Sequence, residues 1–128
     1  MLNRFLWPAA LWTVLITVLS LMSNSRIESI DKFDLPDADK FVHFIFYFTF
    51  TILWYLFLRS VRVFKSLARL RFLIFIVAVL YGACIEACQF LFTEGRSADL
   101  LDALANSLGS GSAILILWLL VKKKRDNN

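Results

Sequence analysis

The sequence predicts an all-α, polytopic membrane protein in which four transmembrane helices form a small bundle. Of the 128 residues, 59% are hydrophobic, and the mean hydropathy is +0.69, whereas a soluble domain is about 45–50% apolar. The apolar residues are gathered into long runs separated by short polar segments. A run that crosses the lipid must be helical, because a lone strand leaves its backbone groups without hydrogen bonds there.

Four runs are long enough to cross a bilayer, since a transmembrane helix needs roughly 20 mostly apolar residues. They extend from about 5 to 22, 41 to 58, 72 to 92 and 100 to 121. The first run has a long apolar core and no small-residue cleavage site after it, so we interpret it as an uncleaved span rather than a signal peptide. The length allows one membrane domain, residues 1–128, and no separate soluble module.

The charges between the spans predict the orientation of the chain. The connection after the second span and the C-terminal tail are strongly basic: Arg59, Arg62, Lys65, Arg69 and Arg71, then Lys122, Lys123, Lys124 and Arg125. The connections after the first and third spans are acidic or mixed. Because Lys and Arg are retained on the cytoplasmic side, we expect a multi-pass protein of the cell inner (plasma) membrane with both termini in the cytoplasm. The net charge of +4 therefore reflects topology, and no nucleic-acid partner is expected.

Polar residues collect at those ends of the second, third and fourth spans that this topology places on the outer side. Ionisable groups are costly in a bilayer, so a one-sided group of them is a hypothesis for a functional site. We take His43, Glu86 and Asp102 as candidate catalytic residues. The candidate ligand-binding residues are Asp39, Lys40, Tyr47, Gln89, Arg96, Asp99 and Asn106.

Spacing places the candidates of the second and third spans on shared helix faces. Asp39, His43 and Tyr47 are spaced i, i+4, i+8 and lie on one face. Glu86 and Gln89 lie close to the outer end of the third span, where a carboxyl group among apolar side chains suits proton transfer. The simpler alternative is structural: Asp39 caps its helix, Lys40 snorkels, and the buried groups pair to fix helix packing.

In the fourth span, Asp99, Asp102, Asn106, Gly109 and Ala113 trace one stripe of a helix. Small residues from 105 to 113 allow a close approach of helices, so we expect this stripe to face inward and to offer a contact for a second copy of the chain. Asp99 could serve only as a helix cap. Arg96 is the natural partner for one of these acids or for an anionic ligand, because a guanidinium pairs with carboxylate or phosphate in bidentate fashion.

The combined pattern of these residues is more specific than any part of it. It reads Asp39-Lys40-x-x-His43-x-x-x-Tyr47, then Glu86-x-x-Gln89, then Arg96-x-x-Asp99-x-x-Asp102-x-x-x-Asn106-x-x-Gly109. This pattern, over the second to fourth spans, resembles the VanZ-like family of small membrane proteins. The resemblance implies several helical spans with motif residues near one membrane face. It also implies an envelope role, since the family's namesake is associated with low-level resistance to the glycopeptide teicoplanin, but it implies no particular reaction.

Three functions fit these residues, and the sequence does not decide whether the chain is an enzyme. The first is a pocket at the outer face that binds or acts on a membrane lipid or a lipid-linked envelope precursor, with no cofactor. The second is a membrane hydrolase or transferase with acid–base catalysis, in which a divalent metal such as Mg²⁺ or Mn²⁺ could join the oxygen-rich residue set. The third is a non-catalytic structural or partner-binding protein. A proton-coupled transporter is less favoured, because no polar groups continue across the inner halves of the spans.

Overall fold

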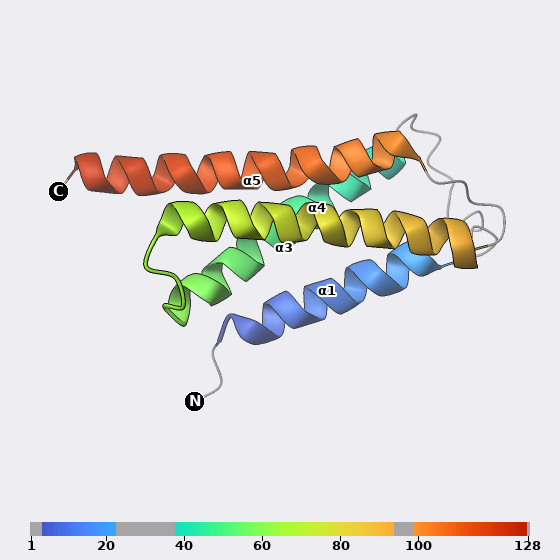
Figure 1. The fold of residues 1–128 in the computed structure, drawn as a ribbon, viewed down its shortest axis with the longest axis horizontal. Helices are drawn as coiled ribbons and strands as arrows, with labels where there is room; N and C mark the ends of the chain where they lie inside the picture. The colour runs from blue at the N-terminus through green and yellow to red at the C-terminus, as the bar shows by residue number, and fades with distance from the viewer. Residues whose placement is uncertain (1–3, 23–37, 94–98, 128) are drawn as a thin grey trace.

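The chain folds into a bundle of antiparallel helices (Figure 1). A computed structural model describes residues 4–22, 38–93 and 99–127, and within these ranges all regular structure is helical. The helices are α1 (Leu6–Leu21), α3 (Ala38–Ser60), α4 (Leu67–Phe92) and α5 (Leu100–Asp126). Successive helices run in opposite directions, so α1 begins and α5 ends at the same end of the bundle (Figure 1). The predicted all-helical fold is confirmed.

The surface of the bundle is that of a multi-pass membrane protein. Helices α3, α4 and α5 are each long and apolar enough to cross a membrane, whereas α1 is a shorter apolar helix of 16 residues. Large apolar side chains are exposed on every helix, including Leu11, Ile45, Leu80 and Leu119. Soluble monomers rarely expose large contiguous apolar surface, so these side chains are suited to contact lipid tails.

Helices α3, α4 and α5 extend beyond the spans predicted from hydropathy, α4 and α5 by the most. Helix α4 begins at Leu67 rather than near residue 72, because the Ser66 side chain caps it by accepting a hydrogen bond from the backbone N–H of Arg69. Helix α5 continues through the basic tail to Asp126 instead of ending near residue 121. Lys and Arg are good helix formers, and cations near a helix C-terminus oppose the negative end of its dipole. Charged residues therefore end the apolar run without ending the helix.

The closest helix contact joins α3 and α5 at a glycine. A Cβ atom built on Gly109 would lie 2.2 Å from the backbone oxygen of Phe44, which is far inside van der Waals contact. Only glycine therefore permits this crossing. On either side of Gly109, Asn106 and Ala113 are almost completely buried, so the predicted stripe does face inward. Because α3 covers it, a second copy of the chain would have to use another part of α5, and such self-association stays a prediction.

Aromatic side chains fill the middle of the bundle. Tyr47 and Phe50 of α3 pack with Ile16 of α1 and Ala78 of α4, and the rings of Phe50 and Tyr81 are stacked with centroids 5.1 Å apart. Among the described residues, α1 contacts α3 and α4 but not α5. The bundle is therefore a three-helix unit of α3, α4 and α5, with α1 packed along one side.

We predict that Gly109→Ala destabilises the bundle strongly, because the added methyl group must displace the backbone of α3. Overpacking of a buried site costs about 1–3 kcal/mol. The measurement is the free energy of unfolding of the protein in mild detergent, titrated with SDS and followed by circular dichroism. Gly111→Ala is the matched control, since a Cβ there meets only Phe75 Cε2 at 3.8 Å. Equal stability of the two variants would contradict this account of the α3–α5 contact.

Candidate functional site

The candidate site is built around His43, in the second turn of α3. This residue is only 3% exposed. It has the side chains of Asp39 on its own helix, Glu86 on α4, and Asp102 and Asn106 on α5 within 4 Å. We call these five residues the His43 cluster. Helices α3 and α5 begin and α4 ends at this end of the bundle (Figure 1), so one imidazole meets side chains from all three.

One ring nitrogen of His43 is held by a short hydrogen bond. His43 Nδ1–H donates to Asn106 Oδ1 at 3.0 Å, and both side chains are buried. Glu86 Oε1 lies 3.8 Å from the same nitrogen. The amide and the carboxylate together fix the ring orientation and keep the hydrogen on Nδ1. Nε2 is therefore the ring nitrogen that can take up or release a proton.

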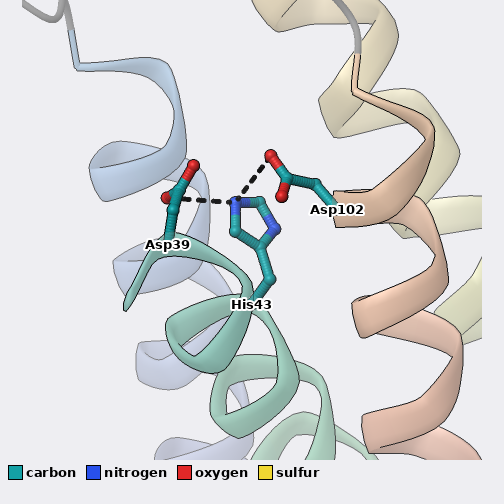
Figure 2. Close-up of side chains that lie close together, drawn as sticks. All are labelled: Asp39, His43 and Asp102. Atoms are coloured by element: carbon teal, nitrogen blue, oxygen red, sulfur yellow. Dashed lines mark ion pairs between the residues drawn. The ribbon is translucent and has the colours of Figure 1, made fainter. Parts of the chain in front are cut away.

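The other ring nitrogen faces two carboxylates, as Figure 2 shows. His43 Nε2 lies 3.8 Å from Asp39 Oδ1 and 3.9 Å from Asp102 Oδ2. The side chain of Asp39 is 59% exposed and that of Asp102 only 8% exposed. On this side of the cluster, His43 Nε2 therefore lies between an exposed carboxylate, that of Asp39, and a buried one, that of Asp102.

The floor of the cluster is made by Tyr47 and Gly82. Tyr47 lies one turn below His43 on α3 and is fully buried. A Cβ atom on Gly82 would lie 3.0 Å from Asn106 Nδ2 and 3.3 Å from Tyr47 Cε1. The absence of a side chain at this position of α4 therefore lets Asn106 and Tyr47 lie against the helix backbone.

Several buried polar atoms in the cluster and on its floor have no hydrogen-bond partner among the described residues. They are Tyr47 Oη, Asp102 Oδ1 and Asn106 Nδ2. Leaving a buried donor or acceptor unsatisfied costs about 1–3 kcal/mol. Asp102 and Asn106 both lie next to the His43 ring, so a single bound group could reach both of them. The cluster therefore offers both donors and acceptors to a hydroxyl, an amine, water or an ion.

The remaining predicted site residues lie outside this cluster. The Gln89 side chain points to α1, where its Nε2 donates to the backbone oxygen of Ser20 at 2.7 Å. Asp99 Oδ1 accepts from the backbone N–H of Leu101 at 2.8 Å, which is the capping role considered for it. Lys40 is half-buried in the first turn of α3. Arg96 lies outside the described residues.

Sequence analysis missed the polar contacts that hold α1 and the middle of α5. Tyr81 Oη donates to the Thr13 backbone oxygen at 3.1 Å and lies 2.7 Å from Thr17 Oγ1. In the middle of the bundle, Thr51 Oγ1 donates to Ser110 Oγ at 3.1 Å. The i, i+4 spacing of Thr13 and Thr17 was the available signal, because hydroxyl groups on one face of an apolar helix commonly bond to a neighbouring helix.

The pattern of the His43 cluster agrees with a comparison against known protein families. A family model described as VanZ/LLP1 matches residues 4–121. The chain belongs to the VanZ/LLP1 family. No curated protein and no solved structure matches it. The match includes α1, which lies outside the residue pattern that suggested a VanZ-like protein. The hydrogen bonds between α1 and α4 therefore lie within the matched residues, as the His43 cluster does.

The charge of the cluster limits what this VanZ/LLP1 chain can bind there. Three carboxyl groups, from Asp39, Glu86 and Asp102, surround one imidazole. Carboxylates accept hydrogen bonds and bind cations, and they repel anions. The described side chains therefore favour hydroxyl groups, amines or a metal ion over a bare phosphate. His43 Nε2, between Asp39 and Asp102, is placed to move a proton to or from such a group.

We predict that Gln89→Met loosens α1 without disturbing the His43 cluster, because it leaves the buried Ser20 carbonyl without its donor. Interhelical hydrogen bonds in membranes contribute about 0.5–2 kcal/mol, and we expect a loss of this size in SDS unfolding. Ser20→Ala keeps the accepting carbonyl and serves as the control. A stability of Gln89→Met equal to that of the unsubstituted chain would remove the structural role assigned here.

Proposed function

We propose that this chain binds a cell-envelope lipid or a lipid-linked cell-wall precursor at the His43 cluster, and that His43, oriented by Glu86 and Asn106, handles a proton of the bound head group. The observation that carries the proposal is the burial of an imidazole within 4 Å of carboxylates from three helices at one end of a membrane bundle. Such groups are costly in a bilayer and mark functional sites.

The charge asymmetry of the bundle supports the placement of this site at the outer face of the plasma membrane. The opposite end carries Arg59, Arg62, Lys65, Arg69 and Arg71, followed by Lys122, Lys123 and Lys124. Lys and Arg mark the cytoplasmic side, so the His43 cluster would lie in the outer leaflet, with both termini inside. A head group could then reach Asp39 from the membrane surface and Asp102 behind it.

The balance of charge in the cluster narrows the kind of head group. Hydroxyl and amine groups, as found on sugars and amino-alcohols, donate hydrogen bonds that Asp39 and Asp102 accept. A phosphate would need cations, and Lys40 and Arg96 stay the residues predicted to supply them. With Nδ1 held by Asn106, His43 would act through Nε2, as a base toward a hydroxyl or as an acid toward a leaving oxygen.

We predict that the purified protein in lipid retains or converts an envelope lipid and that His43→Ala and Glu86→Gln lose this property. The proteins would be incubated with a pool of isoprenoid-linked precursors and lipids whose head groups carry sugars or amino-alcohols, with phosphatidylglycerol left out, and bound and converted species would be read by mass spectrometry. Asp126→Asn, which removes an acid at the far end of α5, is the control. In a teicoplanin-sensitive host, the wild type would raise the inhibitory concentration of teicoplanin and His43→Ala would not.

The outcomes separate the functions. Conversion by the wild type alone makes the chain an enzyme and identifies the bond that is broken. Retention without conversion makes it a lipid-binding protein. If no lipid is retained and both variants lose about 3–5 kcal/mol of stability, the cluster is a buried ion network, and the structural reading replaces the proposal.

A divalent cation at the same cluster is the second candidate, and one observation favours it. Ligand atoms of Asp39, His43 and Asp102 lie within 4.8 Å of one another. Adjacent ligands of Mg²⁺ or Mn²⁺, each about 2.1 Å from the ion, are about 3 Å apart, so the ligand atoms would close by up to about 1.8 Å. The ion would neutralise the acids and supply the positive charge that a phosphate head group needs.

We predict for this candidate that the protein in detergent binds one Mn²⁺ and that Asp102→Asn weakens binding at least about tenfold, because a buried ligand with no other hydrogen bond at Oδ1 is lost. Electron paramagnetic resonance of added Mn²⁺ measures the free ion directly. Asp126→Asn should bind as the wild type does. If no variant differs from the wild type, the metal candidate fails, while metal-free lipid binding is untouched.

A further inference from the structure

A groove opens at the basic end of the bundle, far from the His43 cluster. It lies between the last turns of α3 and α5 and has a volume of about 450 Å³. Its floor is apolar, with the buried ring of Tyr55 and the side chains of Leu117 and Leu120. Arg59 and Lys124 line the same groove. This volume lies within the range of sites that hold small ligands.

The groove joins an apolar floor to two cations at the level where membrane helices meet head groups. The guanidinium of Arg59 lies over the Tyr55 ring, 5.9 Å from its centre, so this cation is next to the apolar floor. Lys124 faces it from the last turns of α5. A soluble anion would leave the leucine side chains unused, and a lipid without charge would leave the two cations unused. An anionic amphiphile uses both.

A second cavity lies on an adjacent face of α5 and is also lined by two cations. It has a volume of about 320 Å³ and is lined by Arg71, Trp118, Val121 and Lys122. Arg71 Nη1 is buried and has no hydrogen-bond acceptor among the described residues. Val121 lines both cavities, so the basic end of α5 is flanked by cations on two helices.

We propose that the groove between α3 and α5 binds an anionic phospholipid, with its phosphate on Arg59 and Lys124 and an acyl chain along Leu117 and Leu120. Basic pockets between transmembrane helices on the cytoplasmic side bind anionic head groups. This site is separate from the proposed function, since it uses none of the residues of the His43 cluster. The competing view is that these cations only fix topology and oppose the dipole of α5.

The test is native mass spectrometry of the full chain in mild detergent, with phosphatidylglycerol and phosphatidylcholine of the same acyl chains. We expect the wild type to bind phosphatidylglycerol at least about tenfold more tightly, and Arg59→Gln/Lys124→Gln to lose this preference. Lys65→Gln/Arg69→Gln removes the same charge outside the groove and should retain it. His43→Ala should also retain it, which separates this site from the proposed function.

Two further probes test the groove itself. Leu120→Trp narrows the groove without changing charge, and we expect it to weaken phosphatidylglycerol binding several-fold. Glycerol phosphate carries the head group without tails and should not bind. If Arg59→Gln/Lys124→Gln and Lys65→Gln/Arg69→Gln lose the preference for phosphatidylglycerol equally, the lipid is attracted by the overall positive charge and not by the groove, and the proposal is overturned. If only Arg71→Gln/Lys122→Gln loses binding, the lipid lies in the second cavity and the proposal is overturned. Tight binding of glycerol phosphate would also overturn it, because the ligand would then be a soluble anion.

Discussion

The close approach of α3 to α5 at Gly109 sets the geometry of both the bundle and the candidate site. The backbone of Phe44 occupies the space in which a side chain on Gly109 would lie. His43 immediately precedes Phe44, and Asn106 lies about one helical turn before Gly109 on the facing helix. The backbone contact therefore fixes the separation at which the imidazole and the amide meet, 3.0 Å. In a lipid environment, where apolar burial does not drive helices together, packing of this kind is the main source of cohesion.

Much of this arrangement could be predicted from the sequence because a bilayer leaves few alternatives. The apolar runs had to be helices, and helical spacing then determined which residues share a face. The i, i+4 spacing of Asp39 and His43 and the i, i+4 spacing of Asp102 and Asn106 placed four members of the cluster on two faces before their partners were known. The small residues that follow Asp102 and Asn106 on the same face of α5, such as Gly109, indicated that this face points into the bundle.

What could not be predicted is how each helix is rotated toward its neighbours. Glu86 and Gln89 are three residues apart, yet the first meets His43 and the second meets Ser20. Helix α4 contacts α1 as well as α3 and α5, so neighbouring positions on α4 are divided between two partners. Hydropathy also misplaced the start of α4 and the end of α5, since it detects where lipid contact stops and not where backbone hydrogen bonding stops.

The unequal lengths of the helices have a consequence for the surrounding membrane. At 1.5 Å per residue, the 16 residues of α1 span about 24 Å, against a hydrocarbon core of about 30 Å. Helix α5 has 27 residues, but its apolar part ends near residue 121 and matches that thickness, and α5 does not contact α1 among the described residues. Such mismatch is relieved by bilayer thinning, tilting or snorkelling, at a cost of fractions of a kcal/mol per ångström. The mismatch is therefore confined to the side of α1, and we expect the bilayer to be thinner there than beside α5.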